Sequence, residues 1–143
     1  MISSFSWLPW ALLSAVFAAL TAIFAKIGLE GIDSDYATLL RTIVIIVLLI
    51  AIVFSANKWV NPFTLNTKSL TFLVLSGFAT GASWLCYFRA LKIGDASKVA
   101  PVDKLSLVLV AVFAALFLGE HPSTKDWIAI FLVSLGVLIL SIK

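Results

Sequence analysis

The chain has 143 residues, of which 62% are hydrophobic and only 12% are charged, and its mean hydropathy is +1.15. Soluble domains carry roughly 25% charged residues, so this composition excludes an ordinary soluble domain and predicts an all-α integral membrane protein. The net charge of +3 is spread over the loops, without the aromatic and basic interleaving of nucleic-acid binding proteins. Cys86 is the only cysteine, which excludes an internal disulfide and favours a small packing residue.

Five apolar stretches recur along the chain, and each is long enough for a transmembrane helix. They cover residues 7–29, 36–56, 69–88, 96–119 and 124–142 and leave little chain for a soluble domain. We therefore expect residues 1–143 to form a single domain of five transmembrane helices. Met1–Ser6 holds no Lys or Arg, and no convincing small-x-small cleavage site follows, so the first stretch is expected to be retained and not removed as a signal peptide.

The first stretch begins near Pro9 and carries alanines at helical spacing that lead to Lys26 on one face. A stripe of small residues lets membrane helices approach closely, which points Lys26 toward protein. The alternative is a lysine that snorkels from the helix end to the membrane surface.

The second stretch should begin after Ser34 or Asp35, either of which is a good N-cap. This start places Arg41 inside the first turns, again with snorkelling as the alternative. Beyond Arg41 the segment 43–54 is bulky on every face, so we expect it to face lipid.

The third stretch is the most polar one without charges. Its polar residues Ser76, Thr80, Ser83 and Tyr87 follow steps of four, three and four, with Trp84 beside them, so they share one helix face. Gly77 and Gly81 form a GxxxG pair typical of closely packed membrane helices. The face predicts either interhelical packing or a pocket wall in which Trp84 and Tyr87 contact a substrate; at a membrane boundary the two aromatics would instead be interfacial anchors.

The fourth stretch keeps charges at membrane depth. The apolar run 105–119 reaches only about 22 Å at ~1.5 Å per residue, so a spanning helix must include Asp103 and Lys104. Pro101 cannot donate to the carbonyl of Ser97, which predicts a kink or a broken first turn. Adjacent helical positions point about 100° apart, so Asp103 and Lys104 are expected to face different partners. Gly119 is the expected residue after the helix end and is followed by Glu120.

The fifth stretch opens with Ser123-Thr124-Lys125-Asp126, a sequence typical of a capping box, and carries no internal charge. The whole sequence lacks a metal-ligand cluster, a nucleophile triad and a phosphate-binding loop. We therefore expect no metal, no other cofactor and no enzymatic activity.

The loop charges bear on orientation. The amino-terminal side carries three cations, Lys58, Lys68 and Lys125, and the other side carries seven, Lys26, Arg41, Arg89, Lys92, Lys98, Lys104 and Lys143. The positive-inside rule then predicts an outside amino terminus. Lys26, Arg41 and Lys104 are candidates for embedded functional groups, and without them the count is four against three. So weak a bias is compatible with insertion both ways and with an antiparallel homodimer that reproduces an inverted repeat.

The segment 88–101, Phe-Arg-Ala-Leu-Lys-Ile-Gly-Asp-Ala-Ser-Lys-Val-Ala-Pro, and the later Leu118-Gly119-Glu120 resemble the signature of the EamA domain in the drug/metabolite transporter superfamily. The segments 25–29 and 40–42 fit the same pattern. The resemblance covers essentially the whole chain as one five-helix repeat, whereas typical members have ten helices from two inverted repeats. It implies a half-size bacterial or archaeal carrier of small metabolites, often outward, with Lys26, Arg41, Pro101 and Glu120 at the matching positions.

These observations favour a secondary transporter in the cytoplasmic (inner) membrane, whose partners are a small solute, membrane lipid and a second copy of the chain. The candidate substrate-binding or coupling residues are Lys26, Arg41, Trp84, Tyr87, Arg89, Asp103, Lys104 and Glu120, with Pro101 as a helix kink. Cations outnumber acids among them, which favours an anionic or zwitterionic solute, with Asp103 or Glu120 as proton-linked groups. The alternatives are a subunit of a lipid-linked-sugar flippase and a non-transporting membrane scaffold or accessory protein.

Overall fold

The computed structural model describes residues 7–142 as helices joined by short loops, with no strand among them. Five of the helical segments are long and apolar enough to cross a membrane. The predicted all-α membrane fold with five spanning helices is therefore confirmed. The expectations for Met1–Ser6 and for Lys143 lie outside the described residues. The chain divides into two compact units, Met1–Ile93 and Gly94–Lys143, which are described separately.

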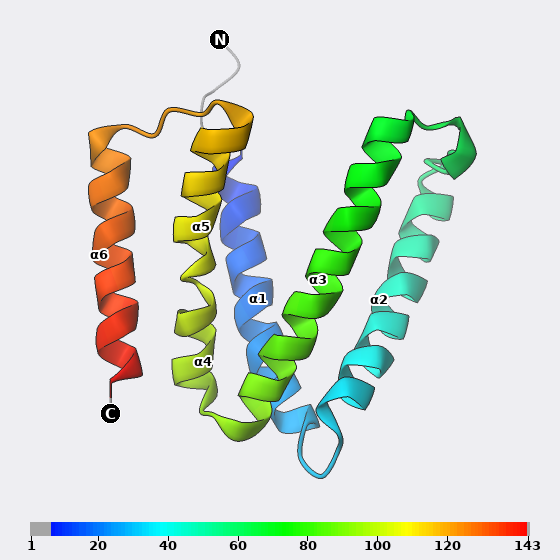
Figure 1. Ribbon diagram of the computed structural model, residues 1–143. Coiled ribbons are helices and arrows are strands. Elements are labelled where there is room, and N and C mark those ends of the chain that lie inside the picture. Colours follow the sequence, from blue (N-terminus) through cyan, green and yellow to red (C-terminus); the bar gives the residue numbers. More distant parts are fainter. Residues whose placement is uncertain (1–6, 143) are drawn as a thin grey trace. The chain divides into compact units, whose positions relative to one another are not determined.

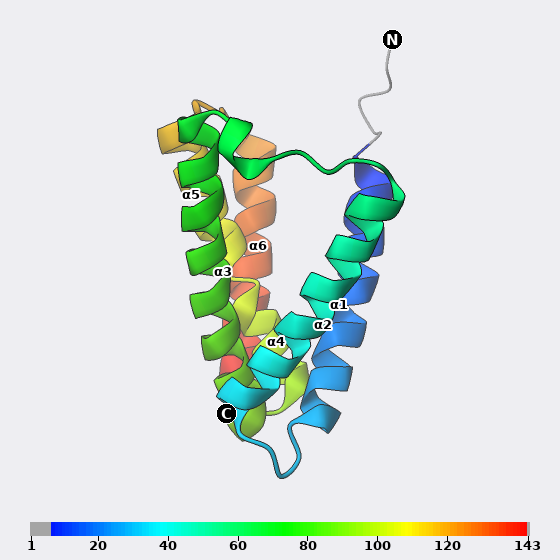
Figure 2. The ribbon, with the colours of Figure 1, turned by 90° about the vertical axis from the view of Figure 1, so that its right-hand side faces the viewer.

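The first unit contains the helices α1 (Leu8–Gly28), α2 (Ser34–Ser55) and α3 (Thr67–Ile93), with a short 3₁₀ turn η1 (Pro62–Thr64) between the last two (Figure 1). Helix α3 contacts both α1 and α2. Helices α2 and α3 lie together near the loop 29–33 and separate toward the loop 56–66 (Figure 2). The buried residues of α3, Phe88 and Leu91, lie in its last two turns, so the packed end of this unit is the one at loop 29–33.

Helix α2 begins at Ser34 because Asp33 caps it. The Asp33 side chain accepts hydrogen bonds from the backbone N–H groups of Asp35 and Tyr36, at 2.9 and 3.1 Å. The prediction of Ser34 or Asp35 as the N-cap is therefore wrong by one or two residues. Three polar residues in a row all suit an N-cap, and the sequence does not reveal that the Asp35 carboxylate is bound to Arg89.

Most apolar side chains of α2 are exposed along 43–54. A helix that is hydrophobic on every side is stable in lipid, so this exposure fits the lipid-facing role expected for the segment. Cys86 is also exposed, so the prediction that it is a packing residue is wrong within this chain.

The second unit contains α4 (Ala96–Asp103), α5 (Ser106–Phe113), the π-helical turn η2 (Ala114–Leu118) and α6 (Thr124–Ser141). Helix α6 packs on α4 and α5. Together α4, α5 and η2 make one interrupted spanning segment, Ala96–Leu118.

The interruption lies after Pro101 and not in the first turn. Pro101 is within α4, and the chain tightens at Lys104 and Leu105, whose N–H groups donate to the carbonyls of Pro101 and Val102, both at 3.0 Å. These are bonds between residues three apart, as in a 3₁₀ turn. The predicted break is therefore present, but it begins at the end of α4, beside Asp103.

Both ends of the connection between η2 and α6 have the conformation that the sequence predicts. Gly119 has the left-handed φ of 67° expected after a helix end, and the N–H of Glu120 donates to the carbonyl of Ala114 at 3.2 Å. Ser123 and Asp126 form the predicted capping box at the start of α6, with reciprocal side-chain and backbone bonds.

Candidate functional site

The predicted site residues fall in both units. Lys26, Arg41, Trp84, Tyr87 and Arg89 belong to the first unit, where the end of α1, the start of α2 and the last turns of α3 come together. Pro101, Asp103, Lys104 and Glu120 belong to the second unit.

Lys26 points from α1 to α3. Its Nζ donates to the backbone carbonyl of Leu91 at 2.6 Å, and Leu91 itself has 0% exposed surface. This carbonyl belongs to the last turn of α3, where helix carbonyls lack a partner within the helix and carry the negative end of its dipole. The lysine therefore faces protein, as the stripe of small residues on α1 indicates, and it ties α1 to the end of α3.

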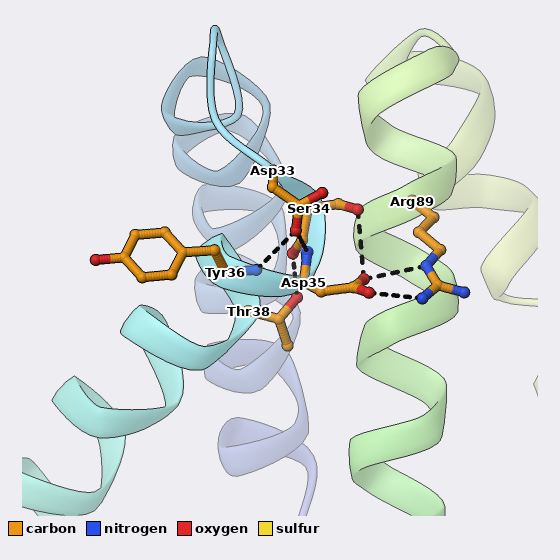
Figure 3. A network of polar contacts seen from close by, with 6 residues as sticks. All are labelled: Asp33, Ser34, Asp35, Tyr36, Thr38 and Arg89. Carbon is orange, nitrogen blue, oxygen red and sulfur yellow. Dashed lines mark hydrogen bonds and ion pairs between the residues drawn. The ribbon is translucent and has the colours of Figure 1, made fainter.

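Arg89 and Lys92 close the same end of the unit. The Arg89 guanidinium binds the Asp35 carboxylate through Nε at 3.0 Å and Nη2 at 2.6 Å (Figure 3), a bidentate geometry that fixes orientation. Lys92 Nζ donates to the carbonyl of Ile32 at 2.9 Å. Because the Arg89 and Asp35 side chains remain 61% and 47% exposed, this pair orients α2 against α3 more than it stabilises the fold.

Figure 3 shows how the start of α2 divides its two carboxylates. Asp33 turns back to the helix and caps it, while Asp35 reaches across to Arg89 with Ser34 beside it. Sequence reasoning missed Asp35 as a site residue, because a partner 54 positions away leaves no periodic signal along one helix.

Arg41 lies under two aromatic rings of α3. Its guanidinium carbon is 4.1 Å from the ring centroid of Trp84 and 5.1 Å from that of Phe88, within the ~6 Å range of a cation–π contact. Its Nη1 atom is buried and has no hydrogen-bond partner among the described residues. Tyr87 stands beside this group, with its ring edge-on to Phe88 at 6.3 Å. Phe88 was not among the predicted site residues, although its spacing of four from Trp84 puts both on one face.

A cavity of about 420 Å³ opens beside Arg41, between α1 and α2, with Phe88 of α3 at one side. Its lining residues are Thr21, Phe24, Ala25, Gly28, Ile32, Ala37, Leu40, Arg41, Val44 and Phe88. This volume is within the ~300–1,000 Å³ of small-molecule sites. The cavity is thus apolar apart from a hydroxyl and one guanidinium.

A second, more open groove of about 620 Å³ runs between α2 and α3. Ser76, Thr80 and Trp84 of the predicted polar face line it, together with Thr38 and Thr42 of α2. The hydroxyls of Thr38, Thr42 and Thr80 donate to carbonyls of their own helices at 2.7–2.9 Å. Since Arg41 lines the cavity and Trp84 lines the groove, the stacked pair forms a wall shared by both.

In the second unit, the prediction that Asp103 and Lys104 face different partners is wrong. Lys104 Nζ lies 3.4 Å from Asp103 Oδ2. The 100° argument holds within a continuous helix, but α4 ends at Asp103 and Lys104 is its cap, so the flexible lysine side chain turns back. Glu120 is exposed just after Gly119.

Among the described residues, no three His, Cys, Asp or Glu side chains gather as the ligands of a metal ion would. What the first unit offers instead is a cation beside an apolar cavity, which suits binding of a small solute.

Comparison with known proteins agrees with this geometry. The family model described as the EamA-like transporter family matches residues 5–142. An uncharacterized transporter in the cobO 3′ region of a Sinorhizobium species is 54% identical over 137 residues, 96% of this chain and 97% of the relative. The uncharacterized transporter YvbV of Bacillus subtilis is 34% identical over 124 residues, 83% of this chain and 39% of the relative.

A third relative is smaller and bears a more specific name. The probable 4-amino-4-deoxy-L-arabinose-phosphoundecaprenol flippase subunit ArnE of Yersinia pestis is 26% identical over 88 residues, 61% of this chain and 77% of the relative. No solved structure matches the chain. The family match over almost the whole length, together with the close transporter relative, shows that this chain belongs to the EamA-like transporter family.

Proposed function

We propose that the protein is a secondary transporter that exports a small anionic or zwitterionic metabolite across the cytoplasmic membrane. The observation that carries this proposal is Arg41, whose buried Nη1 has no hydrogen-bond partner in residues 7–142 and which lines a 420 Å³ cavity. A cation at membrane depth is costly and usually serves a substrate or ion path. Trp84 and Phe88 hold its guanidinium in place without neutralising its charge.

The test is flux in proteoliposomes. The purified chain should exchange a labelled solute from a panel of metabolite anions and zwitterions, and Arg41→Gln should remove most of the flux. Arg41→Lys keeps the charge but not the planar fork, so it should retain part of it. Flux that is unchanged in Arg41→Gln would rule out a path through this cavity.

We further propose that the working unit is an antiparallel dimer. Residues 7–142 contain five helices long and apolar enough to span a membrane, and the chain aligns with only 39% of YvbV, as a single repeat of a longer protein would. An inverted second copy would supply the other repeat of an alternating-access carrier.

Topology can be read by labelling single cysteines from each side. Phe63 and Ile93 are 92% and 90% exposed; Phe63 lies before the start of α3 and Ile93 is its last residue, so the two mark opposite ends of this helix. Each can become cysteine in a Cys86→Ser background, which removes the exposed native thiol. Reaction of both sites from both sides indicates dual insertion. Reaction of each site from one side only excludes the antiparallel dimer.

Asp103 and Glu120 are the proposed proton-linked groups. Asp103 is half-buried beside the interruption between α4 and α5, where the irregular backbone of a membrane helix often serves an ion path. Asp103→Asn should make flux insensitive to an imposed pH gradient; if flux still follows the gradient in this variant and in Glu120→Gln, neither residue couples transport to protons.

A flippase subunit for a lipid-linked sugar is the second candidate, favoured by the similarity to ArnE. It would require a lipid-linked substrate and leave soluble anions unmoved, so the same proteoliposomes with a fluorescent lipid-linked sugar distinguish the two. A scaffold would move neither, and substitutions at Lys26 or Arg41 would then change stability alone.

A further inference from the structure

The charge of the cavity lining is positive only. Among the described residues, ten line it, and Arg41 is the one with a charge; no acidic side chain is present. The Thr21 hydroxyl is already engaged as a donor, since it bonds to the Phe17 carbonyl at 2.8 Å. The cavity therefore offers a positive group and apolar surface, and no carboxylate.

Of the carboxylates nearest to the lining in sequence, Glu30 is exposed and outside the lining, and Asp33 and Asp35 are engaged elsewhere. Asp33 accepts two backbone N–H groups at the start of α2, and Asp35 accepts both arms of Arg89. Neither lines the cavity. Arg41 is thus not neutralised by them, and a ligand ammonium in the cavity would find neither of them as a partner.

The way Arg41 is held also selects the ligand. The rings of Trp84 and Phe88 lie against the guanidinium, whose carbon is 4.1 and 5.1 Å from their centroids, and a cation over an aromatic ring is attracted without an acceptor being supplied to its N–H groups. The N–H bonds of a guanidinium lie in its plane, and its Nη1 has no acceptor within residues 7–142. An acceptor that approaches edge-on, such as a carboxylate, completes this geometry.

We infer that the cavity binds a monoanion with a compact apolar body, a branched or aromatic monocarboxylate, and rejects the amino acid of the same shape. Its role in export rests on the proposed function, but the binding does not. The α-ammonium of an amino acid would lose its water, face no carboxylate and stand near the Arg41 charge, all of which are unfavourable. A buried group left unpaired in one ligand commonly costs about 10- to 100-fold in affinity.

Matched ligands test this directly. The full chain in detergent is titrated with monocarboxylates of graded size at neutral pH, each beside its α-amino acid and its neutral amide, for example 4-methylpentanoate, leucine and 4-methylpentanamide. Thermal stabilisation and calorimetry report binding, because a ligand of the folded state raises its stability by mass action. We expect at least one acid to bind about tenfold or more tightly than both its amino acid and its amide.

Two variants tie binding to the cavity. Arg41→Gln should abolish binding of the acid. Ala25→Leu fills the cavity while leaving Arg41 in place, so it should also weaken binding of the acid. This variant keeps the test available if Arg41→Gln does not fold. Ala18→Leu is the matched control, since Ala18 is an exposed α1 residue outside the lining, and it should bind as the unaltered chain does.

The inference is overturned if no acid binds, if leucine-type ligands bind as tightly as their acids, or if Ala25→Leu leaves binding unchanged. These outcomes separate from those of the flux assay. Selective binding of the acid without any flux would contradict the transporter proposal but agree with the inferred binding site. Flux of zwitterions without selectivity for the acid would contradict the inferred binding site but agree with the transporter proposal.

Discussion

The contact between Arg41 and Trp84 should be measurable as a coupling energy. The guanidinium is 4.1 Å from the Trp84 ring centroid, well inside the ~6 Å limit, and one of its nitrogens is buried. Such contacts contribute about 0.5–1 kcal/mol when exposed and about 2 kcal/mol or more when desolvated. A partly buried pair at this distance should therefore couple by about 1–2 kcal/mol, and the longer Phe88 contact at 5.1 Å by less.

The assay is a double-mutant cycle on the free energy of unfolding in mixed micelles, with Arg41→Met and Trp84→Leu made singly and together. Methionine keeps most of the length of the arginine side chain and removes the charge. Phe78 provides the control, because it is an α3 aromatic that is 74% exposed; Arg41→Met combined with Phe78→Leu should be additive within about 0.3–0.5 kcal/mol. A coupling for Arg41 and Trp84 no larger than this control would refute the reasoning that the ring holds the guanidinium.

Three further predictions concern the packed end of the first unit. Leu91→Ala keeps the backbone carbonyl that Lys26 uses but empties a fully buried site, so the free energy of unfolding should fall by about 2–5 kcal/mol. Leu73→Ala, at an α3 position that is 63% exposed, should change it far less; equal losses would mean that Leu91 is not a packing centre. Asp33→Ala removes the cap of α2 and should cost about 0.5–2 kcal/mol, with Asp33→Ser restoring most of it; a serine variant as unstable as the alanine variant would contradict the capping role. Reversing the charge of Asp35 or of Arg89 alone should lower the cross-linking of cysteines placed at the ends of α2 and α3. Exchanging the two charges in a double variant should restore this cross-linking. A double variant that cross-links no better than the single variants would show that the pair does not orient the helices.

The sequence was sufficient for the features that depend on periodicity and local capping. The five spanning helices, the turn at Gly119 and the capping box at Ser123 and Asp126 follow from hydropathy and local residue chemistry. The inward direction of Lys26 follows from the alanines on its face of α1, and its Nζ reaches Leu91 as a result. In each case the deciding interaction lies within one helix or along one face.

Side-chain contacts between different helices could not be predicted from periodicity and local capping. Asp33 and Asp35 are equivalent as N-caps by residue type, and in the structure Asp33 caps α2 while Asp35 binds Arg89 of α3. The contact of Arg41 with Trp84 is of the same kind, because its parts lie 43 positions apart. The prediction that Asp103 and Lys104 face different partners was wrong for a different reason, because their contact depends on where α4 ends and not on the geometry of a continuous helix.

The cations of the first unit now divide by what they face. Charge at membrane depth predicts function for all of them equally, yet Lys26 and Lys92 donate to helix-end or loop carbonyls and Arg89 to a carboxylate. These three contacts join the end of α3 to α1, to loop 29–33 and to α2, so removal of any of them should loosen helix packing. Arg41 differs from these three in lining the cavity, and its guanidinium lies against the rings of Trp84 and Phe88. Replacement of Arg41 should therefore change ligand affinity directly, whereas replacement of Lys26 should change stability first and ligand binding only as a consequence.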